Sequence, residues 1–354
     1  MGRSLEEDFM KLLICTQAID KEDPILGFFH RWVEEFAVHC EQITVVCLRE
    51  GKYSLPDNVR VYSLGKEEGT SRLTRVRRFY KYIRAFKDDY EAVFVHMNPE
   101  YIILGGYLWH RWGKKISLWY THKSVNSKLR FAMRFVDVVF TASKESFRIQ
   151  SPIVNVMGHG IDTEVFKPDM REASIETRII TAGRIGLSKH IIEMLCVLDE
   201  LHKRGEKFKF TIVGAPVTPQ EEAYAKQLEK EIAARPYRSK VHVLGPLPPS
   251  RLPGLLNEQD IFFNFSTTGS MDKAVLEALS TGVPAITTNE AFRDLLSPFG
   301  LYIEERDYVI LADSVDKIMN RSDRNAVVAT LRNKVVEHHS LSRLIPKIIS
   351  KLKS

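Results

Sequence analysis

Short apolar runs alternate with longer amphipathic segments along this 354-residue chain. The runs are rich in β-branched and aromatic residues and are bounded by turn residues, which predicts strands. Between them, apolar positions recur at helical spacing, which predicts helices. In the first half we expect strands at 11–17, 42–48, 59–64, 92–97, 116–122 and 137–143, and helices at about 25–40, 71–87, 99–112 and 124–135.

The same alternation restarts after a polar, proline-marked break at residues 166–172. Alternation of this kind is typical of parallel sheets with helices on both faces, and the chain is too long for one ordinary core. We therefore predict an α/β protein with two doubly wound domains, 1–168 and 169–339. In the second domain we expect strands at 178–182, 209–214, 241–244, 260–265 and 284–288, helices at about 188–204, 219–234, 249–258 and 270–281, and two or three more helices after residue 291.

Composition is that of a soluble globular protein, with 44% hydrophobic and 27% charged residues. No apolar run approaches the roughly 20 residues that cross a bilayer, and the N-terminus lacks the apolar core of a signal peptide. The four cysteines show no paired metal spacing, which favours free thiols in a reducing compartment. We therefore expect a cytoplasmic protein.

Positive charge is concentrated in one stretch of the first domain. Residues 71–150 contain 16 Lys or Arg and 6 Asp or Glu, a balance of +10 within a net +6, so the rest of the chain sums to −4. Residues 71–87 combine seven basic and no acidic residues with apolar positions at helical spacing. Two interpretations fit equally: a peripheral contact with an anionic membrane or acceptor, or a domain helix with solvated cations. No nucleic-acid recognition motif accompanies the charge.

Polar groups follow several predicted strands of the second domain. Gly183 and Arg184 come directly after one strand, Lys189 lies five residues beyond Arg184, and Gly214 ends the next strand. Glu277 lies in a later predicted helix. Strand ends of this kind form the crevice where open α/β sheets bind nucleotides. Cations suit the phosphates of a nucleoside diphosphate, and a carboxylate suits the ribose hydroxyls.

The order and spacing of these segments resemble those of a retaining glycosyltransferase of family 4, over nearly the whole chain. The segment GRIGLSKH is similar to the family's GR-x-x-x-x-K, and the helix around Glu277, followed by Gly-Val-Pro, is similar to the family's ribose-binding helix. The resemblance implies the GT-B fold, in which two Rossmann-like domains face each other across a cleft. It also implies that the last helix, 340–354, packs back on the first domain.

The resemblance assigns roles to individual residues. Arg184 and Lys189 would stabilise the charge that develops on the leaving diphosphate without a metal, and Glu277 would bind the ribose. The family's base contacts come largely from backbone near the strand end at Leu244. Gly27 stands alone where the family has paired glycines close to phosphate and acceptor.

Three further residues have two interpretations each. His122 ends a predicted strand where family members often keep a histidine facing the donor sugar, and His96 is a second candidate at the same sheet edge. The alternative for each is a structural histidine. Asp162 resembles the family's turn after the last strand of the first domain, as a turn-forming residue or a substrate contact.

The chain departs from the family at Gly269, eight residues before Glu277, where the family has a first glutamate. Asp272 is the nearest acid. It either takes over sugar recognition, with Lys273 beside it facing phosphate or acceptor, or it is only a favourable charge in the first helical turn. The departure bears on the identity of the donor sugar more than on transfer.

The predicted function is the retaining transfer of a sugar from a nucleoside-diphosphate sugar to a glycan, lipid-linked or small-molecule acceptor. No strand-flanked Asp-x-Asp and no cluster with metal spacing occurs in the sequence, so no metal or other cofactor is expected. Two alternatives fit the same residues. One is an epimerase or phosphorylase of the same fold, and the other is a non-catalytic module that binds a membrane or a partner.

Overall fold

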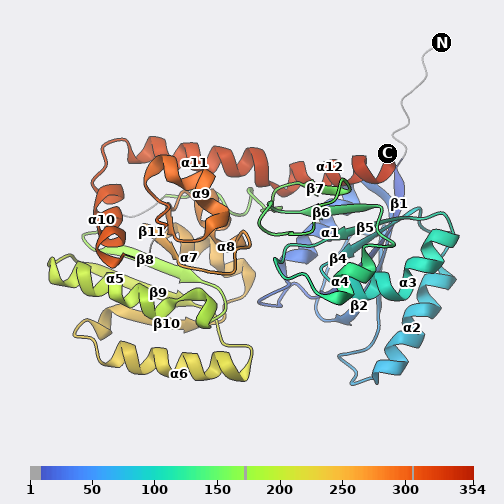
Figure 1. Cartoon of the computed structure of the whole chain (residues 1–354), viewed down its shortest axis with the longest axis horizontal. Coiled ribbons are helices and arrows are strands. Elements are labelled where there is room, and N and C mark those ends of the chain that lie inside the picture. The colour runs from blue at the N-terminus through green and yellow to red at the C-terminus, as the bar shows by residue number, and fades with distance from the viewer. Residues whose placement is uncertain (1–8, 171–173, 305–306) are drawn as a thin grey trace, which may run out of the picture. The chain divides into compact units, whose positions relative to one another are not determined.

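The computed structural model describes residues 9–170, 174–304 and 307–354, and it divides the chain into two compact units (Figure 1). The first unit runs to Gly160 and includes residues 341–354, and the second is Ile161–Ser340. The division lies at 160/161 rather than at the predicted 168/169, because Ile161 and Phe166 are buried in the core of the second unit. Part of the predicted break, residues 171–173, lies outside the described residues.

A parallel sheet of order β3-β2-β1-β4-β5-β6-β7 forms the centre of the first unit. The direction in which strands are added reverses between β1 and β4, which creates a switch point. The last strand, β7, was not predicted, because three residues are too few to show a pattern. The strands are β1 (Met10–Ile19), β2 (Cys40–Glu50), β3 (Val59–Ser63), β4 (Ala92–His96), β5 (Lys115–Trp119), β6 (Val138–Thr141) and β7 (Val154–Val156).

Helices cover both faces of this sheet. Successive residues of β1 alternate between two cores, with Leu12 in one and Leu13 in the other, as side chains on opposite faces of a strand must. The terminal helix packs in the core that contains Leu12, where the resemblance places it. None of the described helices is both long and apolar enough to cross a bilayer. The helices are α1 (Phe28–Val38) and α12 (Leu341–Lys353) on the Leu12 face, and α2 (Arg72–Ala85), α3 (Pro99–Arg111) and α4 (Ser127–Ala132) on the other.

The second unit is built on a parallel sheet of order β10-β9-β8-β11-β12, with its switch point between β8 and β11. Both units therefore confirm the predicted doubly wound α/β fold. The strands are β8 (Thr177–Ala182), β9 (Phe208–Val213), β10 (Val241–Gly245), β11 (Ile261–Asn264) and β12 (Ala285–Thr287). The helices are α5 (Ile191–Lys203), α6 (Pro219–Ala233), α7 (Leu252–Asn257), α8 (Lys273–Ser280), α9 (Arg293–Leu296), α10 (Tyr308–Met319) and α11 (Arg324–His339).

Two predicted element boundaries are corrected at site residues. The strand β5 ends at Trp119, so His122 lies in the loop beyond it, because the neighbouring strand β4 ends at the partner of Trp119. The helix α8 begins at Lys273, so Asp272 occupies the N-cap position rather than the first turn. The Asp272 side chain makes no cap hydrogen bond, because its carboxylate is engaged elsewhere.

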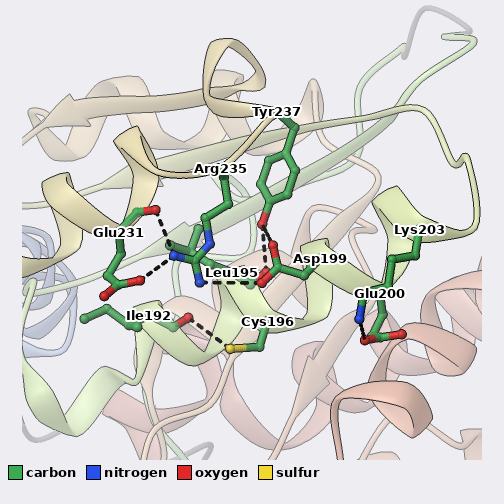
Figure 2. Close-up of polar contacts among 9 residues, drawn as sticks. All are labelled: Ile192, Leu195, Cys196, Asp199, Glu200, Lys203, Glu231, Arg235 and Tyr237. Carbon is green, nitrogen blue, oxygen red and sulfur yellow. Dashed lines mark hydrogen bonds and ion pairs between the residues drawn. The ribbon is translucent and has the colours of Figure 1, made fainter.

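A polar network ties α5 to the segment after α6 (Figure 2). The Tyr237 hydroxyl donates to the backbone oxygen of Leu195 at 2.9 Å and lies 2.6 Å from a carboxylate oxygen of Asp199. Arg235 reaches the same carboxylate at 3.5 Å and also pairs with Glu231. Burial raises the pKa of Tyr237, and the charge of Asp199 raises it further. The network thus supplies hydrogen-bond partners for the hydroxyl of Tyr237, a residue that is only 2% exposed.

Replacing Tyr237 with Phe should lower the free energy of unfolding by about 2 kcal/mol, because a buried hydrogen bond to a charged acceptor is lost. Chemical unfolding followed by circular dichroism measures the change. Lys203→Ala is the control, since it breaks the exposed Lys203–Glu200 pair on the same helix and should leave the midpoint unchanged. Equal effects of the two substitutions would show that the network does not stabilise this unit.

Candidate functional site

Two loops meet at the switch point of the second sheet. The loop after β8 passes through a short 3₁₀ turn, Leu187–Lys189, before α5 begins, and the loop after β11 leads into α8. The backbone N–H of Thr267 donates to the oxygen of Ser188 at 3.1 Å, and the hydroxyl of Thr267 lies 3.1 Å from Nε2 of His190. His190 adopts a left-handed backbone with φ of 52°. The two loops are therefore joined by backbone and side chain together.

Lys189 and Asp272 form an ion pair across this junction. The ammonium of Lys189 lies 2.9 Å from Oδ1 of Asp272. Asn264, the last residue of β11, donates from Nδ2 to the other carboxylate oxygen at 2.7 Å, and Thr287, the last residue of β12, donates to Oδ1 of Asn264 at 3.0 Å. A chain of polar contacts thus runs from the β8 loop to the end of β12 and holds the Asp272 carboxylate in place.

Arg184 lies in the same loop and faces the start of α6. Its guanidinium is 3.6 Å from Oε1 of Glu221, and its side chain is 53% exposed. Glu221 closes a capping box with Thr218, in which its Oε2 accepts from the backbone of Thr218 at 3.1 Å. The carboxylate is therefore fixed by the helix start, whereas the guanidinium stays accessible.

Glu277 is buried in α8, with 4% of the residue exposed. A buried carboxylate is costly without a partner, and Lys273, four residues earlier on the same helix, pairs with it. The ammonium of Lys273 also lies 5.6 Å from the centre of the Phe166 ring. Glu277, the residue predicted to bind the ribose, thus already has one charged partner within its own helix.

Bare backbone forms the ends of β8 and β9. Gly183 and Gly214 adopt φ values of +143° and +135°, which side chains rarely tolerate. A Cβ at Gly214 would overlap the carbonyl oxygen of Gly183, so no other residue fits there. The Leu244 side chain, near the end of β10, is 47% exposed. The ends of β8 and β9 therefore carry glycine backbone without side chains at the switch point, close to Lys189.

Two predicted site residues, Gly27 and His122, belong to the first unit. Gly27 occupies the N-cap position of α1 with a right-handed helical backbone. His122 is exposed, and its Nδ1 accepts from the backbone N–H of Ser124 at 3.1 Å. Asp162, at the start of the second unit, accepts from the backbone N–H groups of Glu164 and Val165, which agrees with its interpretation as a turn residue.

His96 is a structural residue and does not face the surface. It is 2% exposed, its ring stacks on Phe29 with 4.0 Å between centroids, and its Nδ1 lies 3.2 Å from the Thr16 hydroxyl. Burial lowers its pKa to about 3, and nearby His159 acts in the same direction. His96 therefore helps to hold α1 on the sheet at the switch point of the first unit.

Acidification should destabilise the first unit through His96. An unfolded histidine takes up a proton near pH 6.5 and the buried one only near pH 3. Between these pH values the unfolded state binds one more proton than the folded state. The contribution of His96 to the free energy of unfolding therefore falls by about 1.4 kcal/mol per pH unit as the pH drops. His96→Gln should show a correspondingly shallower slope between pH 6 and pH 4.

Urea unfolding followed by tryptophan fluorescence measures this slope, because all four tryptophans lie in the first unit. His122→Gln, which changes an exposed histidine, should keep the wild-type slope. If His96→Gln keeps it as well, the histidine is not buried in its neutral form.

Sequence reasoning missed the residues that hold the predicted ones in place. Asn264 is the last residue of the buried strand Ile-Phe-Phe-Asn, and a polar residue in such an apolar run was a usable signal. Glu221 lies three residues after Thr218 in a capping-box pattern, which was also readable. The contact between His190 and Thr267 joins residues 77 apart and had no local signal.

Residues 162–333 match the family model for glycosyl transferases group 1. The chain is 26% identical over 172 residues to a component of the phosphatidylinositol N-acetylglucosaminyltransferase of Arabidopsis thaliana, covering 46% of this chain and 37% of that protein. It is 23% identical over 218 residues to the UDP-Gal:alpha-D-GlcNAc-diphosphoundecaprenol alpha-1,3-galactosyltransferase of Escherichia coli, covering 55% and 52%. The matches span about half the length of these relatives or less.

Solved structures resemble the chain over nearly its whole length. HepE of Anabaena, in complex with UDP and glucose, has a TM-score of 0.76 at 14% identity, covering 98% of this chain and 100% of HepE. A glycosyltransferase of Rickettsia africae has a TM-score of 0.74 at 13% identity, covering 97% and 98%. These likenesses show that the fold is GT-B.

Proposed function

We propose that this chain, whose residues 162–333 match the family model for glycosyl transferases group 1, is a retaining glycosyltransferase that uses a nucleoside-diphosphate sugar. The observation that carries the proposal is the edge of the second sheet, where bare glycine backbone, Arg184 and Lys189 lie at the strand ends and a buried glutamate follows in α8. Open α/β sheets bind nucleotides at such a switch point.

In the proposed complex the two cations contact the diphosphate and Glu277 accepts from the ribose hydroxyls. As the sugar leaves, negative charge grows on the β-phosphate, and preorganised cations stabilise it. The acceptor hydroxyl attacks from the face that the phosphate leaves, and the departing phosphate takes its proton, which gives retention. Because the chain supplies its own cations, the proposed reaction needs no divalent metal. UDP is the first nucleotide to test, since both UDP and a UDP sugar occur in the names of similar proteins.

The acceptor is proposed to be a glycan or a lipid-linked sugar. The Escherichia coli relative acts, by its name, on a diphosphoundecaprenol-linked sugar. In this chain α2 packs on the core through Phe79 and Ile83, so the domain-helix interpretation holds for its buried face. Leu73, which is 59% exposed, and the exposed Arg77 and Lys81 lie four residues apart on the opposite stripe. We propose that this stripe contacts an anionic membrane surface.

Arg184→Ala and Lys189→Ala should each lower the rate of sugar transfer, or of donor hydrolysis without an acceptor, by about 10²-fold, the effect of losing one preorganised charge-stabilising group. Donor turnover is measured in EDTA, and thermal shifts with UDP, GDP and ADP report binding. A nucleotide at 100 times its dissociation constant should add about 2.7 kcal/mol of stability.

Arg204→Ala, which removes a cation paired with Asp313 and Asp316, is the control. Near-wild-type rates in both variants would reject the phosphate assignment.

Reversing Arg77, Lys81 and Arg84 to Glu should release the protein from anionic vesicles, since each basic residue near such a surface contributes about 1 kcal/mol. All three side chains are exposed on α2. Arg78 is left intact because it pairs with Glu68 at 2.8 Å. Vesicle sedimentation at low and physiological salt measures binding, and donor hydrolysis should persist.

A charge-matched control reverses Lys207, Lys226 and Lys230, which are exposed in the second unit. Sedimentation of this control should equal that of the wild type. If the α2 variant also sediments like the wild type, the membrane contact is rejected and α2 is an ordinary domain helix with a solvated face.

A further inference from the structure

Every cation predicted to meet the diphosphate is already paired with a carboxylate of the chain. The pairs are Arg184–Glu221, Lys189–Asp272 and Lys273–Glu277. Each pair is formally neutral, so the six side chains together offer no net positive charge to a ligand. A diphosphate that contacts one of these cations directly therefore competes with a carboxylate of the chain. Which pair resists this exchange decides which ligands the site accepts.

Lys189–Asp272 is the pair that joins the two loops, and it resists exchange more than the Arg184–Glu221 pair does. The two side chains are 17% and 15% exposed, so their 2.9 Å contact is largely shielded from water, which strengthens it. The Arg184 pair is longer, at 3.6 Å, and its guanidinium is 53% exposed. The Lys273–Glu277 pair is about as shielded, with side chains 25% and 5% exposed, but it lies within one helix and does not join the loops.

Asp272 is held where it is without help from Lys189. As an N-cap residue it could accept from the free N–H groups of α8, which is the usual role of an aspartate there. Its side chain makes no such bond and turns instead toward Asn264, which is fixed in turn by Thr287. The carboxylate is therefore anchored on two strand ends, whereas the ammonium of Lys189 sits on a flexible four-carbon stem.

The ammonium also lies over the strand end where phosphate is expected. A Cβ built on Gly183 would be 3.5 Å from Cε of Lys189 and 3.9 Å from its Nζ. The lysine thus lies beside the bare backbone of the β8 end, where Gly183 stays exposed, and Asp272 holds the ammonium there. A phosphate that approaches Gly183 therefore encounters a lysine that is already paired with Asp272.

We propose that Asp272 is a specificity-determining residue that masks Lys189 from phosphate ligands. This inference rests on the proposed function of the same site. A ligand must supply enough negative charge to draw the ammonium from a fixed carboxylate, which favours a diphosphate over a monophosphate. Removing the charge of Asp272 should therefore tighten phosphate binding, whereas loss of a sugar contact would leave the affinity for UDP, which carries no donor sugar, unchanged.

Asp272→Asn tests the inference, because the amide keeps an oxygen for Asn264, removes the charge and replaces the oxygen that Lys189 contacts by an NH2 group. The dissociation constants of UDP and UMP are measured by calorimetry at one salt concentration. UDP should bind about tenfold more tightly to the variant, which corresponds to about 1.4 kcal/mol. The preference for UDP over UMP should shrink. Asp272→Ser gives the same result with a smaller side chain if the first variant does not fold.

Two further proteins separate masking from a structural effect. In a Lys189→Gln background, Asp272→Asn should leave the UDP affinity unchanged, because the carboxylate acts only through the lysine. Asp316→Asn removes a carboxylate from the 2.7 Å pair with Arg204 in the same unit and should also leave it unchanged.

If wild type binds UDP and Asp272→Asn binds it equally or more weakly, the inference is overturned and the proposed function stands. If neither protein binds UDP, GDP or ADP, both are overturned.

Discussion

The loops after β8 and β11 can meet only because their strands are neighbours whose helices leave on opposite faces of the sheet. Right-handed crossovers run outward from this point in both directions, so α5 and α8 do not compete for the same space. The gap between the two loop starts is closed by the Lys189–Asp272 ion pair and by the contact of Thr267 with His190. The topology brings the two loops together, and the side chains on them supply the charged groups at this switch point.

The burial of charged side chains at the switch point of the second sheet calls for a physical reason. An ion pair taken out of water gains little net stability, because desolvation offsets the attraction, and apolar residues would often serve the fold equally well. Glu277 is nonetheless only 4% exposed, and the Asp272 side chain is 15% exposed. Stability alone gives a weak reason for charged residues in such places. A ligand that exchanges with one member of the Lys189–Asp272 or Lys273–Glu277 pair would give a better reason, because the charged group that it meets is already in position and largely shielded from water.

The sequence predicted the parts of the fold that depend on local pattern. Strands such as β8 and β9 and helices such as α6 matched closely, because alternation and periodicity are visible within one segment. The domain division and the burial of His96 depend on contacts between segments, and residues 16, 29 and 96 come together only in the folded sheet. At the site, residue types were readable, but the partners of Lys189, Arg184 and Glu277 were not, because ion pairing is decided by side-chain geometry.

The two units show how little the fold alone decides. Both sheets reverse strand order beside their first strand, and both therefore have a switch point at the carboxyl edge. In the first unit that point is filled by packing: His96 stacks on Phe29, and the Tyr101 hydroxyl donates to the backbone oxygen of Thr16 at 2.9 Å. In the second unit glycines keep the same point bare and charged pairs surround it. The same reversal of strand order thus gives a packed core in one unit and an accessible, charged site in the other, so the function must be argued from these side chains.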